Sequence, residues 1–119
     1  MQFRGFDERG ACEFTIPDYI LCQLAELRGG IEDYIDTSGV ITLTLQRHCI
    51  LLSHLVPCEV LTANRRMVEA SEGRRPRRRP IQVRAHTIEP DSFVVCDGNS
   101  TFCNLAWSGF DLIPVEVIL

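Results

Sequence analysis

The chain contains no lysine, no Cys-x-x-Cys pair and no apolar run long enough to cross a bilayer. A membrane-spanning helix needs about 20 consecutive apolar residues, so no membrane span is predicted. The segment from Met1 to Glu8 lacks the layout of a signal peptide, and we expect a cytoplasmic protein. The six cysteines mostly lie in apolar runs, such as those around Cys22 and Cys49. Their spacing favours buried, reduced thiols over disulfides or a zinc site.

All twelve basic residues are arginines, and they are concentrated in the middle of the chain. Residues 1–45 have a net charge of −5, residues 46–84 of +6 and residues 85–119 of −5. A GC-rich genome explains the lack of lysine more simply than phosphate recognition does, although arginine suits phosphate through its paired hydrogen bonds. The segregation of charge leaves a local basic patch open, despite the overall charge of −4.

The length of 119 residues, with 45% hydrophobic and 24% charged residues, predicts a single globular domain. In the first half, Asp18 is expected to cap a helix whose apolar residues reach Leu27, before two glycines end it. Val40–Leu45 alternates as a strand does, and Cys49–Val56 reads as a second strand. A hairpin turn at residues 46–48 would join the two.

The second half predicts two helices and three strands. These are a helix over residues 63–71 with Thr62 as its N-cap, strands at Ile81–Ala85 and Phe93–Cys96, a helix over residues 100–108, and a strand at Ile113–Leu119. The mixture predicts an α+β fold whose sheet combines strands from both halves of the chain.

Five arginines lie within six residues of a loop that contains Pro76 and Pro80. They are Arg74, Arg75, Arg77, Arg78 and Arg79. Proline keeps such a segment extended and exposed. Clustered arginines favour contact with phosphate groups, either of a nucleic-acid backbone or of a nucleotide. In the alternative interpretation the loop is solvated and pairs with the acidic N-terminal region.

The segment Asp97-Gly98-Asn99-Ser100-Thr101 connects an apolar strand to a helix. Unpaired backbone N–H groups at a helix start, with the positive end of the helix dipole, form an anion site. The hydroxyls of Ser100 and Thr101 add donors, and Asp97 is a candidate Mg²⁺ ligand. A structural interpretation is equally open, in which Asp97 or Asn99 caps the helix and Gly98 permits the tight turn.

Glu59 has both a structural and a functional interpretation. A Glu59 carboxylate that faced Asp97 would form a metal site for phosphodiester cleavage. A surface glutamate at a helix entry is the more common role for such a residue. Trp107 is expected to pack in the core.

Four segments of the chain resemble the ParB/sulfiredoxin superfamily, in the order that the family has them. They are Leu55–Glu59 as the first strand and its turn, Thr62–Gly73 as a short helix, Arg79–Arg84 as the Pro-Ile-x-Val strand, and Ser92–Val117 as the Gly-centred turn, helix and Ile-Pro-Val strand. The resemblance implies a small mixed sheet with short helices over residues 50–119. It leaves residues 1–47 as an extra N-terminal helix and strand.

The family's Gly-centred turn carries either arginines that hold nucleotide phosphates or a catalytic cysteine. This chain has Thr101 where the arginine is expected and Asn99 where the cysteine is expected. Sulfiredoxin activity is therefore not expected, because the cysteine nucleophile is absent. The resemblance implies binding of DNA or nucleotide phosphates in plasmid, phage or chromosome biology.

Some compact relatives are nucleases or nucleotide hydrolases, including plasmid proteins that limit DNA transfer between cells. This adds a metal-dependent nuclease or NTPase as an expectation. Asp97 and Glu59 are then the catalytic candidates, with Mg²⁺ and a nucleoside triphosphate as cofactors. The alternative is a non-catalytic protein-interaction module whose acidic N-terminal segment recruits a protein partner.

Overall fold

A five-stranded mixed sheet lies at the centre of the computed structural model, which describes residues 2–7, 10–39, 42–45, 49–51, 57–87 and 91–118. The strands are β3 (Thr42–Leu45), β4 (Cys49–Leu51), β5 (Ile81–Ala85), β6 (Phe93–Asp97) and β7 (Leu112–Val117). Their order is β3-β7-β5-β6-β4. The central β5 pairs parallel with β7 and antiparallel with β6. The α+β class and the mixed sheet expected from the sequence are confirmed.

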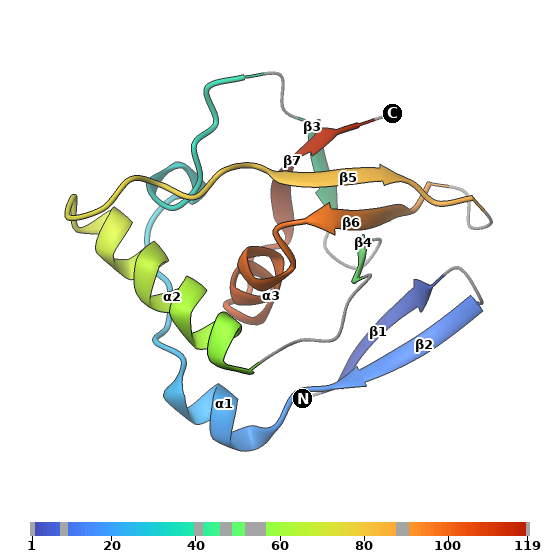
Figure 1. Cartoon of the computed structure of the whole chain (residues 1–119), viewed down its shortest axis with the longest axis horizontal. Coiled ribbons are helices and arrows are strands. Elements are labelled where there is room, and N and C mark those ends of the chain that lie inside the picture. Colours follow the sequence, from blue (N-terminus) through green and yellow to red (C-terminus); the bar gives the residue numbers. More distant parts are fainter. Residues whose placement is uncertain are drawn as a thin grey trace.

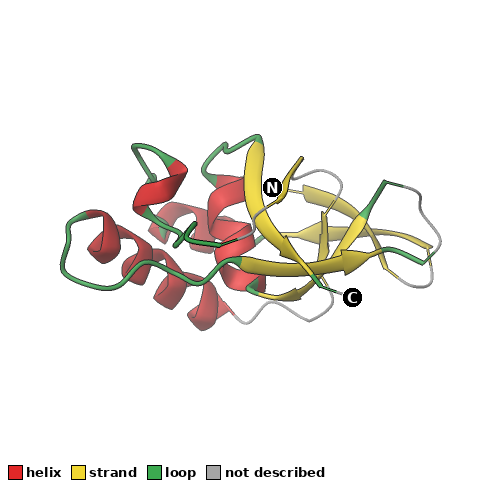
Figure 2. Cartoon of the chain, turned by 90° about the horizontal axis from the view of Figure 1, so that it is seen from above, coloured by secondary structure: helices red, strands yellow, loops and turns green. Residues whose placement is uncertain are grey.

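The helices gather on one side of the molecule and the strands on the other (Figure 2). Helix α2 (Pro57–Ser71) packs against α3 (Asn99–Trp107), and α3 in turn contacts β5 and β7 (Figure 1). The short helix α1 (Asp18–Gln23) packs against α2. A separate hairpin of β1 (Gln2–Asp7) and β2 (Gly10–Thr15) lies next to β4. None of the helices in the described ranges has the length and apolar content of a membrane span.

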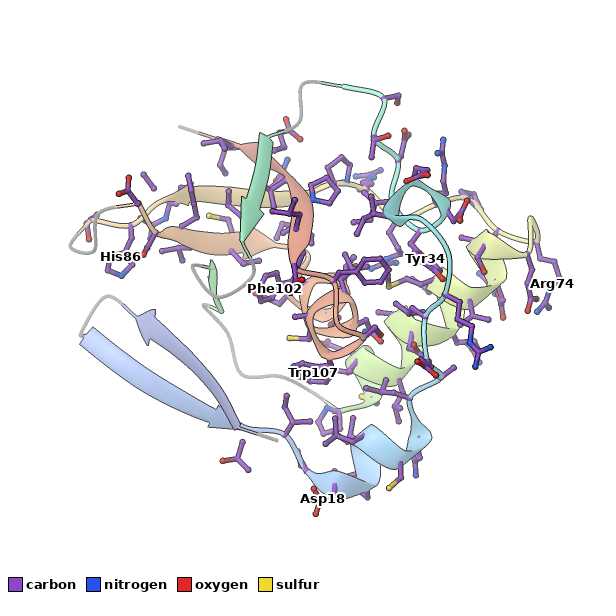
Figure 3. The ribbon with its side chains drawn as sticks, turned by 180° about the vertical axis from the view of Figure 1, so that it is seen from behind. Asp18, Tyr34, Arg74, His86, Phe102 and Trp107 are labelled. Atoms are coloured by element: carbon purple, nitrogen blue, oxygen red, sulfur yellow. The ribbon has the colours of Figure 1, made fainter. Side chains whose placement is uncertain are left out.

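The main core lies between α3 and the central strands. Phe102 and Leu105 of α3 are fully buried, and they belong to one cluster with the inward side chains of the sheet. The strand residues of this cluster are Ile81, Val83, Val95, Ile113 and Val115. Trp107 is half-buried and packs against this cluster and against a smaller one around α1 (Figure 3). The expected packing role of Trp107 is confirmed.

A segment between α1 and β3 is also part of the core. It contains a short 3₁₀ helix, η1 (Ile31–Asp33), followed by Tyr34 and Ile35, which are 2% and 0% exposed. The Tyr34 ring meets Phe110 edge-on at a centroid distance of 6.1 Å. We call residues 31–36 the strap, because they pass beside the arginine loop and bond to its backbone.

The helix predicted from Asp18 to Leu27 is wrong in its length and in its cap. It ends at Gln23, and the N-cap position is Pro17, with no side-chain cap. The early end has a tertiary cause. In the orientation that satisfies both of its polar atoms, the buried Asn64 amide bonds the backbone N–H and C=O of Ala25. Leu27 therefore lies outside the helix, and its side chain packs in the main core.

The start of α2 and the pairing of β3 with β4 also differ from prediction. α2 begins at Pro57, which the first turn of a helix accepts. Glu59 therefore lies in the helix and not in a turn after a strand. Thr62 is interior to the helix, and its hydroxyl donates to the Cys58 carbonyl at 2.7 Å instead of capping.

β3 and β4 occupy opposite edges of the sheet, so the expected hairpin between them is wrong. Its proposed turn, residues 46–48, lies outside the described residues, as do residues 52–56 of the expected second strand. The strands pair instead with β7 and β6, which lie far along the chain. The alternation of apolar and polar residues indicates a strand, but it does not specify which distant strand it pairs with.

The cysteines follow the expectation in part. Cys103 is buried, and burial raises the pKa of its thiol far above the ordinary range. Cys96 is half-buried, whereas Cys22 and Cys58 are exposed, so the prediction of burial is wrong for those two. All four are free thiols.

Candidate functional site

The turn between β6 and α3 adopts a conformation that only glycine accepts easily. Gly98 has φ 92° and ψ 27° and occupies the N-cap position of α3, with no side-chain cap. A Cβ atom at this position would lie 3.2 Å from Ile81 Cγ1 and 3.3 Å from Ile81 Cα. Asp97 and Asn99 therefore do not serve as the helix cap that the structural interpretation proposed. The N-terminus of α3 has no side-chain cap, and Asp97, Gly98 and Thr101 line a cavity beside it.

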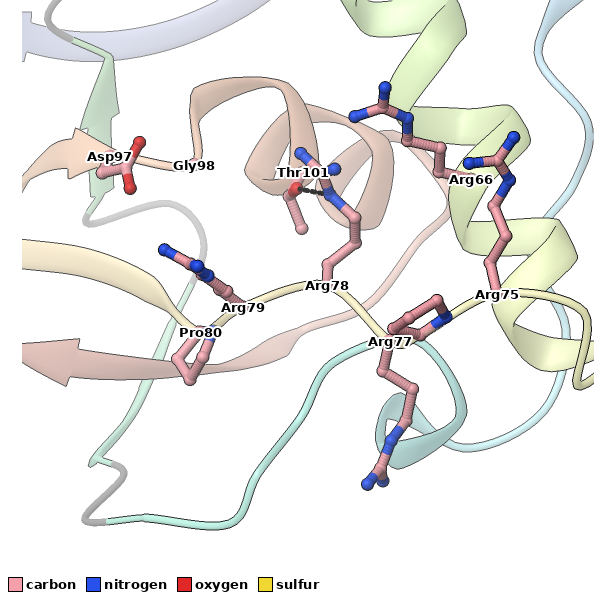
Figure 4. A pocket seen from close by; sticks show the side chains of 10 residues that line it. Arg66, Arg75, Arg77, Arg78, Arg79, Pro80, Asp97, Gly98 and Thr101 are labelled. Carbon is pink, nitrogen blue, oxygen red and sulfur yellow. Dashed lines mark hydrogen bonds between the residues drawn. The ribbon is translucent and has the colours of Figure 1, made fainter.

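The strap holds the arginine loop against this turn. The Arg78 N–H donates to the Tyr34 carbonyl at 2.8 Å, and the Asp36 N–H donates to the Arg78 carbonyl at 2.8 Å. Together they form a parallel bridge between Ile35 and Arg78. Because both backbone groups of Arg78 are bonded, the direction of its side chain is set. Its Nε donates to Thr101 Oγ1 at 3.2 Å (Figure 4).

Arg66 of α2 reaches the same place and was not among the residues predicted from the sequence. It lies outside the arginine run, on an otherwise ordinary helix, so no local pattern marks it. A cavity of about 350 Å³ lies between α2, the loop and the turn, and we call it the arginine pocket. Its lining consists of Arg66, Arg75, Pro76, Arg77, Arg78, Arg79, Pro80, Asp97, Gly98 and Thr101.

A buried amide network sets the position of α2 relative to α3. Asn104 of α3 is 1% exposed, and its Nδ2 donates to the Val60 carbonyl at 3.0 Å and to the Ser100 carbonyl at 2.7 Å. Its Oδ1 accepts from the Asn64 amide at 3.2 Å. Arg66 lies one helical turn after Thr62 and Ala63, and the three line a cavity together with Ser100 of α3, so the packing of α2 on α3 brings Arg66 beside the α3 turn.

Like charges meet in the arginine pocket. The pKa of Arg78 is lowered, first by burial of its guanidinium and then by the nearby charge of Arg66, while Asp97 acts in the opposite direction. Neither Arg66 nor Arg79 makes an ion pair or a side-chain hydrogen bond within the described ranges. Arg66, Arg78 and Arg79 therefore bring more positive charge to the N-terminus of α3 than the single carboxylate of Asp97 offsets.

The remaining arginines of the loop are engaged by protein groups. Arg74 binds Glu72, which raises the pKa of Arg74, and Arg75 binds Glu69. Arg77 turns to the other side of the loop (Figure 4). There its Nη1 donates to the Glu32 carbonyl at 3.0 Å, and its Nη2 lies 3.8 Å from Asp36 Oδ1. We call Arg74, Arg75 and Arg77 the outer arginines. The expected pairing with the acidic N-terminal region applies to Arg77 alone among them.

Glu59 does not line the arginine pocket. It lines a second cavity of about 280 Å³, together with Cys58, Thr62, Ala63, Arg66, Arg78 and Ser100. Asp97 lines the arginine pocket and is not part of the lining of this second cavity. Within the described ranges, no group of three or more His, Cys, Asp or Glu side chains could hold a metal ion. A metal at Asp97 would therefore take most of its ligands from a bound molecule.

Comparisons with known proteins give a fold neighbour and no family. No protein-family model and no curated protein matches the sequence. Among solved structures, the chain is similar to a free serine kinase crystallised as a mutant in complex with ADP. The TM-score is 0.52 at 14% identity, over 71% of this chain and 36% of that chain. The likeness shows a shared fold, and the matched part of this chain spans about a third of the kinase chain.

Proposed function

We propose that this protein binds the phosphate groups of a nucleotide in the arginine pocket. The observation that carries the proposal is the convergence of Arg66 and Arg78 beside the N-terminus of α3, with no ion pair for either in the described residues and with Asp97 as the one carboxylate in the pocket lining. Guanidinium groups bond phosphate oxygens in pairs, and backbone N–H groups at a helix start add further donors.

Arg78 takes the place of the arginine that the turn itself lacks. The resemblance to the ParB/sulfiredoxin superfamily places an arginine at position 101, where this chain has threonine. The Arg78 guanidinium bonds the Thr101 hydroxyl, so a cation stands beside this position although it comes from another segment. The presence of Arg78 beside Thr101 supports the proposed resemblance to the superfamily. It also provides a cation for a phosphate site at a turn that has no arginine of its own.

Two features favour a nucleotide over a DNA backbone. The outer arginines already have carboxylate or carbonyl partners, so the loop presents less unpaired charge than its sequence indicates. The unpaired arginines face a concave cavity of a size that suits a small ligand. The fold neighbour bound to ADP agrees with this choice. DNA binding, and a role in plasmid, phage or chromosome biology, stay predictions.

Magnesium would enter the pocket with the ligand. Mg²⁺ is usually held by one or two carboxylates together with substrate phosphates, and Asp97 supplies one exposed carboxylate at the pocket wall. The arginines would neutralise the rest of the phosphate charge. Asp97→Asn is therefore expected to remove the Mg²⁺ dependence of nucleotide binding, while binding in EDTA becomes at least as tight, because a carboxylate at the pocket wall repels phosphate.

Calorimetric titration with ADP, ATP, inorganic tripolyphosphate and a DNA duplex tests the proposal, with Arg78→Ala and Arg77→Ala as matched variants. Loss of a charge-assisted pair costs about 1.5–3 kcal/mol. We therefore expect Arg78→Ala to weaken tripolyphosphate binding at least about tenfold, and Arg77→Ala to change it less than about threefold. Equal losses in both variants, or binding of the duplex alone, would contradict the proposal.

A further inference from the structure

The second cavity, lined by Glu59, adjoins the arginine pocket through a common wall. Arg66 and Arg78 line both cavities. A phosphate group held between these two guanidiniums would therefore have one side facing each cavity. A ligand bound there could extend in both directions, as a nucleoside diphosphate or triphosphate does and inorganic phosphate does not.

The two cavities differ in chemistry, and this difference sets the direction of the ligand. The arginine pocket adds Arg79, which makes no ion pair in the described residues, to the common pair, and Asp97 offsets only one of these charges, so the pocket is cationic. The second cavity adds a carboxylate, two hydroxyls and a thiol, from Glu59, Thr62, Ser100 and Cys58. A phosphate chain is attracted to the first cavity and repelled from the second by Glu59. The uncharged part of the ligand would then occupy the second cavity.

The polar groups of the second cavity mostly accept hydrogen bonds. The Glu59 carboxylate makes no ion pair or hydrogen bond with any described residue, and as an anion it can only accept. The Thr62 hydroxyl uses its proton on the Cys58 carbonyl at 2.7 Å, which leaves its lone pairs as acceptors. The Ser100 hydroxyl makes no hydrogen bond within the described ranges and can act in either direction.

We propose that the second cavity binds the ribose of a nucleotide whose phosphates lie in the arginine pocket, with Glu59 accepting hydrogen bonds from the 2′ and 3′ hydroxyls. Two adjacent hydroxyls match the two oxygens of one carboxylate, as acidic residues bind ribose in dinucleotide sites. The proposal rests on the proposed function, and it adds selectivity for ribonucleotides over deoxyribonucleotides. Glu59 is then a specificity-determining residue, in place of the catalytic role expected from the sequence.

Binding of ADP, 2′-deoxy-ADP and tripolyphosphate to the wild-type protein and to Glu59→Ala tests the inference. A site built to bond a hydroxyl rejects the ligand that lacks it. We expect the wild type to bind ADP about tenfold more tightly than 2′-deoxy-ADP, because the deoxy ligand lacks one of the two hydrogen bonds to the charged carboxylate. In Glu59→Ala that preference should fall to less than about twofold, while tripolyphosphate binds at least as tightly as before.

Glu116→Ala is the matched control, because Glu116 is an exposed glutamate on β7 and its removal changes the net charge equally. Its preference for ADP should stay at the wild-type value. If tripolyphosphate binds and the wild type shows no preference for ADP, the sugar site is wrong and the phosphate site stands. If neither tripolyphosphate nor ADP binds, both proposals fail. An unchanged preference in Glu59→Ala would also overturn the assignment of Glu59.

Discussion

The outer arginines and the pocket arginines, Arg66 and Arg78, carry the same guanidinium group. They differ in whether a protein carboxylate already forms an ion pair with it. Arg74 and Arg75 pair with glutamates at the end of α2, and Arg77 pairs with the strap. Arg66 and Arg78 instead face each other across the open end of α3. The comparison shows that the charge available to a ligand depends on which protein groups already share it. A count of arginines in the sequence overestimates that charge.

The largest expected effect is on the packing that holds the pocket arginines in place. Asn104→Ala would leave the Val60 carbonyl and the Asn64 amide without their buried partner, at a cost of about 2–3 kcal/mol in the free energy of unfolding. Urea denaturation measures this loss. Tripolyphosphate binding should weaken as well, because Arg66 depends on the same contact between α2 and α3.

Ser71→Ala is a control for that prediction, since the Ser71 hydroxyl donates to the Val68 carbonyl in an exposed position. Its cost should stay below about 0.5 kcal/mol. Equal destabilisation by the two variants would mean that the amide network is not what joins α3 to α2.

The next effect concerns the turn that the pocket arginines approach. Gly98 and Gly109 both have positive φ, 92° and 94°, but a Cβ would meet Ile81 only at Gly98. Alanine at either position lowers the free energy of unfolding by about 1 kcal/mol, because the backbone is left-handed there. Gly98→Ala lowers it by about 1 kcal/mol more through the contact with Ile81. Thermal unfolding compares the two. Phosphate affinity should fall in Gly98→Ala and stay unchanged in Gly109→Ala, and an equal fall in both would contradict a site at the α3 turn.

The contribution of Arg66, which no sequence pattern indicated, can be tested by comparing it with its neighbour Arg65. Arg66 lines both cavities, whereas Arg65 is exposed and lies 3.9 Å from Glu69. Arg66→Ala should weaken tripolyphosphate binding about tenfold, or about 1.4 kcal/mol, and Arg65→Ala by less than about twofold. If the order is reversed, the pocket arginines are wrongly identified.

The smallest effect on phosphate binding is expected from the outer arginines, although they make up most of the arginine run in the sequence. Replacing Arg74, Arg75 and Arg77 together by alanine removes three charges that are shared with protein groups, and exposed pairs contribute little. Tripolyphosphate affinity, measured by calorimetry, should change less than about threefold. A larger loss than in Arg78→Ala would remove the distinction between outer and pocket arginines.

Prediction from the sequence was most accurate where local patterns decide the structure. The strands β5, β6 and β7 and the helix α3 lie close to their expected positions, because alternation, helical spacing and glycine turns act over a few residues. It failed for β1, β2 and η1, which were not predicted, and for the early end of α1. There Asn64 of α2 bonds the backbone of Ala25, a contact that the local pattern does not contain.

By itself, the sequence determined the α+β class, the glycine turn before α3 and the concentration of arginines near Pro76 and Pro80, since each depends on residue type and short spacing. Only the tertiary structure decided which guanidiniums are available. Arg78 is directed inward by backbone bonds to the strap, and Arg66 is brought in by the packing of α2 on α3. Both contacts join segments far apart in the chain, and the electrostatics of a pocket follow from distances that only the folded protein sets.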